Sequence, residues 1–414
     1  MLTQLNKMEE FKRTEIASLG EFGLIDHLTK HVEVKNNSTL KGIGDDAAVL
    51  DYKEKQVLVT TDLLLEGIHF DLTYVPLKHL GYKSAVVNFS DIYAMNGQPK
   101  QITVSLGISK RFSVEDLEQL YAGIQLACDV YHVDLIGGDT SASLTGLAIS
   151  ITCIGEANKE KIVYRNGARE NDLICVSGDL GAAYMGLQLL EREKKVFAGE
   201  KNFQPAFEGR EYLLERQLKP EARKDIIEEL AKRNIVPTAM MDISDGLSSE
   251  LLHICRQSNT GCRIYEERIP IDYQTAVMAE EFNMSLITAA LNGGEDYELL
   301  FTVPLAKHDD ISALPGIRII GHITAPVTKE LAENPDSKIL EKIYSIFVLM
   351  QKAVYNSADK RQVFDSEFFS SYINDEEIKS KKEYVSIVCV LGFSVFSNME
   401  KRLSEKIIDS IQQI

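Results

Sequence analysis

The sequence is organised around one stretch, which reads Gly-Ile-Gly-Asp-Asp-Ala-Ala-Val-Leu at residues 42–50, Val-Leu-Val-Thr-Thr-Asp at 57–62 and Glu-Gly-Ile-His-Phe at 66–70. Two glycines lead into the adjacent carboxylates Asp45 and Asp46, and an apolar run of β-strand character ends in two hydroxyls and Asp62. Two carboxylates about 4 Å apart repel each other by roughly 4 kcal/mol at an effective dielectric constant of about 20. A converging cluster of this kind needs a cation, and hard oxygen ligands beside hydroxyl groups suit Mg²⁺.

Length and composition indicate a globular protein with room for two or three domains. The chain has 414 residues, of which 44% are apolar and 26% charged. Its net charge of −17 argues against a nucleic-acid or acidic-membrane partner, because both need a basic surface. The charge permits phosphorylated small molecules as ligands, provided that metal ions supply positive charge.

The cysteines and the N-terminal segment favour a cytoplasmic protein without a membrane partner. None of the six cysteines forms a C-x-x-C pair and most lie in apolar runs, so we expect reduced core residues. The polar segment Met1–Glu15 has no secretory core. The apolar run Val385–Phe396 is too short to cross a bilayer.

Hydrophobic periodicity predicts two alternating units of strands and helices, joined by a hinge near residues 156–161. Ser113 and Asp116 form a capping-box pattern at the start of a helix that runs to about Tyr131. The other predicted helices cover residues 1–35, 78–96, 181–190 and 222–233. The predicted strands cover residues 57–61, 101–107, 133–140, 145–155, 172–177 and the end of 292–302. Residues 192–217 are predicted to be a loose, charged connection.

Carboxylates follow turns throughout the first 300 residues, namely Asp45, Asp46, Asp62, Asp91, Asp139, Asp242, Asp245 and Glu295. The sequence contains no P-loop, no G-x-G-x-x-G before a helix, no nucleophile elbow and no zinc-type Cys/His spacing. Phosphoryl transfer depends mainly on positioning and charge neutralisation. The consistent interpretation is therefore a site in which several Mg²⁺ ions bridge acidic side chains and a polyphosphate.

Several of these residues also have an ordinary structural interpretation. Asp91 lies in an apolar helical segment, where a carboxylate is costly unless paired or ligated, but it could lie on a polar stripe. Asp242 and Asp245 flank Ser244, either as site residues or as an N-cap of a helix beginning there. The turn Gly178–Gly181 could offer its amides to phosphate or could only pack. Tyr121 could be a core residue and His69 a structural histidine.

Six motifs occur in order along the chain: Gly-Ile-Gly-Asp-Asp-Ala-Ala (42–48), Thr-Thr-Asp-x-x-x-Glu-Gly-Ile-His-Phe (60–70), Val-Asn-Phe-Ser-Asp-Ile-Tyr-Ala-Met-Asn-Gly (87–97), Ile-Gly-Gly-Asp-Thr (136–140), Asp-Ile-Ser-Asp-Gly-Leu (242–247) and Gly-Gly-Glu-Asp-Tyr-Glu-Leu (293–299). Together with Glu-Phe-Gly-Leu-Ile at 21–25, this set resembles the thiamine-monophosphate kinase family. The match runs from about residue 20 to residue 324, and single motifs are shared with relatives that have the same fold.

The resemblance implies an α/β (α+β) fold with two domains, like that of aminoimidazole-ribonucleotide synthetase. It implies an N-terminal domain over residues 1–156 that pairs in a homodimer, a C-terminal domain over 157–324 and a divergent tail over 325–414. It also implies a reaction. The γ-phosphoryl group of ATP passes directly, in line, to thiamine monophosphate to give thiamine diphosphate, the last step in its biosynthesis, with several Mg²⁺ ions as cofactors.

The resemblance assigns residues by motif, and none of them is a catalytic nucleophile, because the transfer would be assisted by metal. Mg²⁺ would be held by Asp46, Thr60, Thr61, Asp62, Asp91, Asp139, Asp242 and Asp245. ATP would contact Tyr121, Gly138, Asp139, Arg165 and Ser244. Thiamine monophosphate would contact His69 and Glu295.

Residues 325–414 depart from the family. Its members usually close with a Gly-aromatic-x-His-Phe-like end whose aromatic residue stacks on the substrate, and this sequence has nothing similar after Thr324. Two alternatives therefore stand beside the kinase. The first is another ATP-using enzyme of the superfamily, although the first cysteine, Cys128, comes too late for a selenophosphate synthetase. The second is a nucleotide-binding protein inactivated by its altered C-terminus.

Overall fold

The computed structural model describes residues 39–41, 45, 48–52, 55–197 and 207–326. All of them belong to one compact unit, Val34–Ala332. The predicted helix over residues 1–35, the tail beyond Pro326 and the predicted metal ligand Asp46 lie outside the described residues. The predicted domain boundaries stay predictions.

The first half of this unit contains a six-stranded sheet in the order β1-β2-β3-β6-β4-β5. All neighbouring strands are antiparallel except β4 and β5, which are parallel. Inward and outward residues alternate regularly along β6, as expected for a sheet with one covered face. The strands are β1 (Thr39–Lys41), β2 (Ala48–Tyr52), β3 (Lys55–Leu65), β4 (Gln98–Ile108), β5 (Asp134–Ala142) and β6 (Leu147–Asn158).

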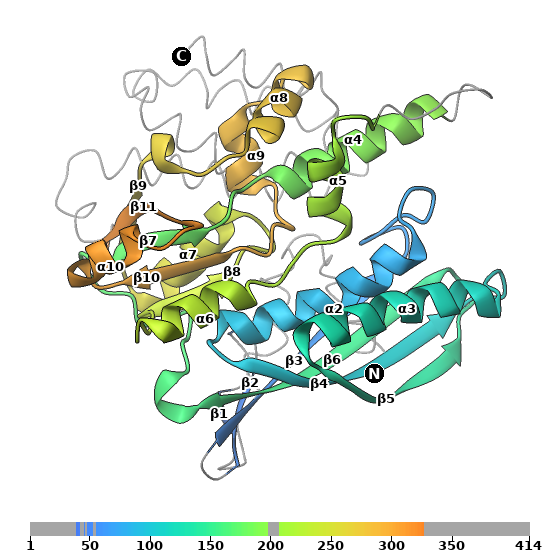
Figure 1. Ribbon diagram of the computed structural model, residues 1–414, viewed down its shortest axis with the longest axis horizontal. Helices are drawn as coiled ribbons and strands as arrows, with labels where there is room; N and C mark the ends of the chain where they lie inside the picture. Colours follow the sequence, from blue (N-terminus) through green and yellow to red (C-terminus); the bar gives the residue numbers. More distant parts are fainter. Residues whose placement is uncertain (1–38, 42–44, 46–47, 53–54, 198–206, 327–414) are drawn as a thin grey trace, which may run out of the picture. The chain divides into compact units, whose positions relative to one another are not determined.

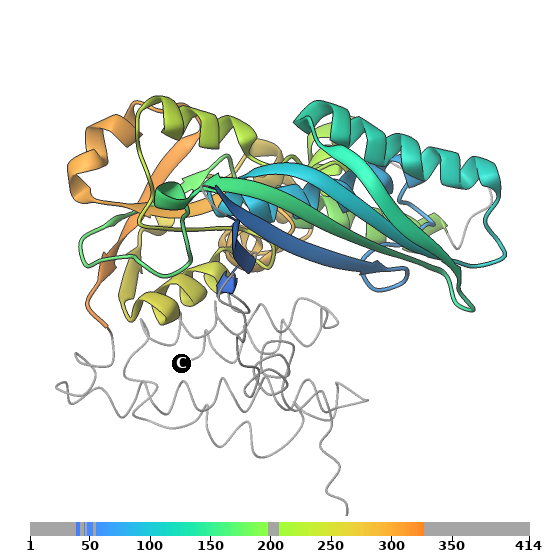
Figure 2. The same cartoon turned by 90° about the horizontal axis from the view of Figure 1, so that it is seen from below.

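Two long helices, α2 (Leu77–Ala94) and α3 (Val114–Tyr131), lie along one face of this sheet (Figure 1). Seen from below, the strands lie in front of α2 (Figure 2). The helices approach closely because both carry a glycine at the crossing: a Cβ on Gly81 would lie 1.9 Å from the Leu120 carbonyl oxygen. The predicted capping box is confirmed, since the Asp116 amide donates to Ser113 Oγ at 3.2 Å and the Ser113 amide donates to Asp116 Oδ2 at 2.8 Å.

The second half contains a five-stranded antiparallel sheet in the order β8-β10-β7-β11-β9. Its strands are β7 (Leu173–Ser177), β8 (Ala239–Asp242), β9 (Gly261–Ile264), β10 (Leu299–Val303) and β11 (Ile317–Thr324). Its α-helices are α4 (Ala182–Phe197), α5 (Glu211–Leu218), α6 (Lys224–Lys232), α7 (Leu247–Ser258), α8 (Tyr273–Glu281), α9 (Leu286–Asn292) and α10 (His308–Ser312). Short 3₁₀ turns are η2 (Lys159–Lys161), η3 (Glu266–Arg268) and η4 (Leu305–Lys307).

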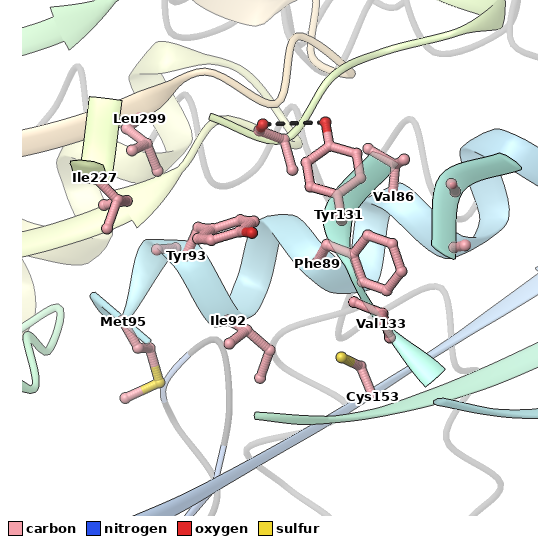
Figure 3. Close-up of a cluster of buried hydrophobic side chains, with 14 of the residues drawn as sticks. Val86, Phe89, Ile92, Tyr93, Met95, Tyr131, Val133, Cys153, Ile227 and Leu299 are labelled. Atoms are coloured by element: carbon pink, nitrogen blue, oxygen red, sulfur yellow. Dashed lines mark hydrogen bonds between the residues drawn. The ribbon is translucent and has the colours of Figure 1, made fainter. Parts of the chain in front are cut away.

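Helix α2 joins the two halves through one continuous apolar core. Figure 3 shows Ile92 of α2 on the same side as Cys153 of β6, while Tyr93 faces Ile227 of α6 and Leu299 of β10. A helix that is apolar on every side is a buried helix, and α2 is buried along most of its length. Two polar side chains of α2, Lys83 and Ser90, contact residues of the second half.

Most predicted elements overlap observed ones, but one prediction was wrong, and one helix begins later than one of its two interpretations placed it. Residues 192–217 are not a loose connection throughout, because α4 continues to Phe197 and α5 occupies Glu211–Leu218. Helix α5 is only eight residues long and fully buries one apolar side chain, Leu213, so its hydrophobic pattern is too short to be recognised in the sequence. The helix expected from Ser244 begins at Leu247, after Gly246 with φ +121°.

Two other sequence expectations can be compared with the described residues. The five cysteines among them are free thiols and four are buried, as expected for reduced core residues. Within the same residues, the helices are either too short or too polar to cross a membrane.

Candidate active site

Strand β3 directs two predicted ligands toward α2. Side chains alternate along a strand, so Thr60 and Asp62 share one face and Thr61 points to the other. The Thr60 hydroxyl donates to Asp91 Oδ2 of α2 at 2.6 Å. The Thr61 hydroxyl instead donates to the Ile151 carbonyl oxygen at 3.1 Å, on the opposite face. The structure therefore brings Thr60, Asp62 and Asp91 together but does not bring the Thr61 side chain to them.

The residue that precedes Asp91 on α2, Ser90, contacts the second half of the molecule. The Ser90 hydroxyl donates to Oδ2 of Asp242, the last residue of β8. Asp242 is only 3% exposed, so its carboxylate needs such a partner. Consecutive residues of one buried helix thus connect to Asp242 on one side and to Thr60 on the other.

The loop before β10 carries Glu295 in an unusual backbone conformation. Gly294, Glu295 and Tyr297 have φ values of +69°, +61° and +52°. Such values are costly for residues other than glycine and persist only where the surroundings fix them. Here the Glu295 amide donates to the Ser244 carbonyl oxygen at 2.7 Å and the Tyr297 amide to the Ile243 carbonyl oxygen at 2.9 Å. The loop is thereby fixed to the segment that follows Asp242.

Alternate residues of this loop face opposite ways. Asp296 accepts the Gly181 amide at 2.8 Å, and Glu298 accepts the Ser177 hydroxyl. Glu298 also pairs with the guanidinium groups of Arg216, at 2.9 Å, and Arg223. The Gly181 amide, which closes the turn Gly178–Gly181, is therefore engaged by a buried carboxylate.

Electrostatics places four predicted carboxylates around one buried phenol. The pKa of Tyr297 is raised well above its usual value, first by burial and then by the charges of Glu295, Asp62, Asp242 and Asp91. Burial raises the pKa of Asp62 to about 6, with a further rise from the Glu295 charge and an opposing effect of His69. These side chains come from β3, α2, β8 and the loop before β10. Their shared influence agrees with the contacts Thr60–Asp91, Ser90–Asp242 and Tyr297–Glu295, which connect these segments into one acidic cluster.

Sequence reasoning missed a buried cation that contacts this cluster, Lys83 of α2. The Lys83 side chain is 9% exposed, forms an ion pair with Glu295 and donates to the Gln217 carbonyl oxygen at 3.0 Å. The sequence did contain an indication, because Lys83 is a charged residue in the same apolar helical segment as Asp91. A buried lysine there needs an anionic partner just as a buried aspartate needs a cationic one.

The remaining predicted residues occupy several places. His69 Nδ1 accepts the Leu65 amide at 3.0 Å, and the Arg165 amide donates to Asp45 Oδ1 at 2.8 Å. The Asp245 amide donates to Glu250 Oε1 at 3.1 Å. Tyr121 is 37% exposed on α3.

Gly138 and Asp139 lie on β5, an exposed edge strand of the first sheet. At Gly138 a Cβ would lie 1.7 Å from the Val104 carbonyl oxygen, so the backbone there requires glycine. The ligand assignments of these residues and of those in the preceding paragraph stay predictions.

The acidic cluster offers the oxygen donors that Mg²⁺ prefers. Its donors are carboxylate and hydroxyl oxygens, and the raised pKa of Asp62 shows that added positive charge would be favourable. Within the described ranges, no three His, Cys, Asp or Glu side chains meet closely enough to hold a metal ion by themselves. Mg²⁺ commonly binds through one or two carboxylates together with waters and substrate phosphates. The donor set therefore fits Mg²⁺ held jointly with a polyphosphate.

Comparison with known proteins supports the fold and the family. Residues 44–157 match the family described as AIR synthase related protein, N-terminal domain. The thiamine-monophosphate kinase of Aquifex aeolicus is 38% identical over 289 residues, covering 70% of this chain and 87% of that protein. That of Bacillus subtilis is 33% identical and covers 82% of this chain and 99% of that protein. Because 82% of the 414 residues is more than 324 residues, the second alignment includes residues after Thr324.

Solved structures give the same result. The structure titled "AaThiL complexed with AMPPCP and TMP" has a TM-score of 0.66 and 36% identity, and covers 76% of this chain and 93% of that chain. A protein from Thermus thermophilus, 21% identical with a TM-score of 0.64, shares the fold and covers 75% of this chain and 96% of that chain. The chain belongs to the thiamine-monophosphate kinase family, and it is a kinase with an AIR-synthase-like α/β fold.

Proposed function

We propose that this chain phosphorylates thiamine monophosphate to thiamine diphosphate, using ATP and Mg²⁺. The observation that carries the proposal is the pair of contacts made by consecutive residues of α2, in which Asp91 accepts the Thr60 hydroxyl of the first half and Ser90 donates to Asp242 of the second half. Further support comes from a similar protein whose structure contains an ATP analogue, AMPPCP, together with TMP. We also propose that this reaction completes thiamine diphosphate synthesis and that residues 1–156 pair in a homodimer.

The residues of the cluster have distinct proposed tasks. Asp62, Asp91 and Asp242 hold Mg²⁺, together with Asp46, Asp139 and Asp245. Bound Mg²⁺ supplies positive charge that neutralises phosphate oxygens and fixes their orientation. Thr60 and Ser90 orient Asp91 and Asp242, because each donates a hydrogen bond to one oxygen of the carboxylate.

The proposed transfer is a direct displacement at phosphorus. A phosphate oxygen of thiamine monophosphate attacks the γ-phosphorus of ATP, a new P–O bond forms, and the bond to the β-phosphate oxygen breaks to release ADP. The attacking group is a phosphate monoester, whose second pKa is near 6, so it is already anionic at neutral pH. No general base and no phosphoenzyme are needed, and the protein acts by positioning and charge neutralisation. His69 and Glu295 orient the acceptor, while Tyr121, Gly138, Arg165 and Ser244 bind ATP.

A direct assay tests this proposal. Purified protein is incubated with ATP, Mg²⁺ and thiamine monophosphate, and thiamine diphosphate is separated and quantified. We expect product in equimolar amount with ADP. ATP binding without product would overturn the proposal in favour of a nucleotide-binding protein, and ATP turnover that ignores thiamine monophosphate would favour another enzyme of the superfamily.

Replacing Asp242 tests the role of the cluster in the same assay. We expect Asp242→Asn to lower turnover about a hundredfold or more, because a group that organises charge near the transferred phosphoryl is lost. Asp309→Asn, at a fully exposed carboxylate on α10, is the matched control and should keep full activity. Wild-type turnover in Asp242→Asn would refute the assignment of Asp242.

A further inference from the structure

Lys83 is a buried cation that contacts the acidic cluster through Glu295, and it belongs to none of the motifs. Its amine contacts the Glu295 carboxylate and, at 3.0 Å, the carbonyl oxygen of Gln217 in the last turn of α5. Enclosing an ammonium group costs several kcal/mol unless an anion and hydrogen-bond acceptors surround it. The position therefore depends on its partners, and three segments meet there: α2, α5 and the loop before β10.

The two side chains of this ion pair differ in their exposure to solvent. The Lys83 side chain is 9% exposed, whereas that of Glu295 is 39% exposed. Glu295 also accepts the Tyr297 hydroxyl at 3.3 Å, and its backbone has φ +61°. Lys83 thus holds the inner side of a carboxylate whose outer side remains accessible.

Glu295 has a second neighbour that makes its orientation matter. Its charge acts on Asp62, which lies on β3 in the first half of the molecule. Without Lys83, Glu295 would lose its nearest cation while the repulsion from Asp62 persisted. Two carboxylates that repel each other move apart unless a cation holds them. The position of the Glu295 carboxylate therefore depends on Lys83.

We propose that Lys83 is a positioning residue for the phosphate acceptor: by fixing Glu295, it sets the affinity for thiamine monophosphate and leaves the affinity for ATP unchanged. The inference rests on the proposed function, in which Glu295 contacts the acceptor. A purely structural role, joining α2 to α5, is the competing explanation. If Lys83 had only this structural role, its replacement would lower the stability of the fold, or it would change the KM values of both substrates by the same factor.

The test measures KM for each substrate in the full-length protein. We expect Lys83→Met to raise KM for thiamine monophosphate about ten- to a hundredfold, the range for losing a hydrogen bond to a charged group, and KM for ATP by less than about twofold. Lys78→Met is the matched control, because Lys78 lies on the same helix and is exposed. If Lys83→Met does not fold, Lys83→Gln keeps a donor toward Gln217 and carries the same expectation.

A double variant separates positioning from structure. Because Lys83 acts through Glu295, Lys83→Met should add less than about twofold to KM for the acceptor once Glu295→Gln is present. Equal changes in both KM values, or full additivity in the double variant, would overturn the inference. A wild-type protein that forms no thiamine diphosphate would refute the proposed function itself. An active wild type with an unaffected Lys83→Met variant would refute only the role of Lys83.

Discussion

The two sides of the loop Gly294–Glu298 place carboxylates in opposite circumstances. Asp296 and Glu298 point toward the second half's own core, where the guanidinium groups of Arg216 and Arg223 and the amide of Gly181 meet them. Glu295 and Tyr297 point toward the acidic cluster. On one side of the loop, two guanidinium groups neutralise the carboxylates. On the other side, several carboxylates lie near one another.

The causes of two pKa shifts make the difference concrete. Burial raises the pKa of Asp296 to about 7, and there the charge of Arg216 and the Gly181 amide oppose the rise. The charge of Glu298 adds to that rise. Burial also raises the pKa of Asp62 to about 6, where the charge of Glu295 adds to the rise and His69 opposes it. Both carboxylates are disfavoured as anions, but the opposing charge at Asp296 is the permanent charge of a guanidinium group, whereas Asp62 has only an imidazole.

The largest expected effect is a loss of stability when the ion pairs of Asp296 and Glu298 are broken. Arg216→Met leaves Glu298 and Asp296 buried without one of their cations, so we expect a loss of about 3–5 kcal/mol in the free energy of unfolding. Urea denaturation at neutral pH measures this loss. Arg318→Met, at an exposed position on β11, is the control and should change stability by less than about 0.5 kcal/mol. An Arg216→Met variant as stable as this control would remove the distinction between the two sides.

A matched pair of substitutions on one loop sharpens the comparison. Glu298→Gln should cost about 2–3 kcal/mol, because it removes the anion shared by two buried guanidinium groups. Glu295→Gln should cost less, about 1–2 kcal/mol, because its side chain is 39% exposed and the amide oxygen can still accept a hydrogen bond from Lys83, but it should raise KM for thiamine monophosphate. Unfolding and steady-state measurements on both variants test this. The reverse pattern would mean that the roles of the two sides are exchanged.

The sequence predicted the acidic cluster better than its counter-charges. Asp62, Asp91, Asp242 and Glu295 were identifiable because each ends or interrupts an apolar segment. Lys83 and Arg216 were missed because a cation on a helix is usually exposed, and only tertiary contacts show that these two are buried. Their partners lie far away in the chain, so no local pattern reveals them.

Strand geometry contained information that motif matching did not use. Adjacent residues of a strand point to opposite faces, so Thr60 and Thr61 cannot direct both hydroxyls to one site. The observed contacts follow this rule, with Thr60 bonded to Asp91 and Thr61 to the Ile151 carbonyl. The two threonines therefore provide a smaller test on either face of β3.

Thr60→Val removes the donor to Asp91, and we expect it to cost about 1.5–2 kcal/mol and to lower turnover, because a hydrogen bond to a charged group is lost. Thr61→Val, the neighbouring and isosteric change, should cost about 0.5–1 kcal/mol and leave turnover unchanged, since its hydroxyl lies on the other face. Thermal unfolding and product assays distinguish them. Equal losses of turnover would mean that Thr61 reaches the site through its backbone.

The smallest expected effect tests whether the Asp62 side lacks positive charge. The pKa of Asp62 is about 6 in the folded protein, against 3.8 in a free side chain. Because the folded value is higher, the stability linked to this group is fully present below about pH 4 and is lost as the pH rises through about 6.

Asp62→Asn abolishes that loss. In EDTA, the stability of the variant relative to the wild type should therefore rise with pH, by about 1 kcal/mol between about pH 4.5 and pH 7.5, a value reduced for partial exposure. Urea denaturation at both pH values measures the difference, and Asp309→Asn should show no such trend. If the wild type instead gained stability relative to the variant as the pH rose without divalent cations, Asp62 would already have its counter-charge within the chain, and the contrast between the two sides of the loop would fail.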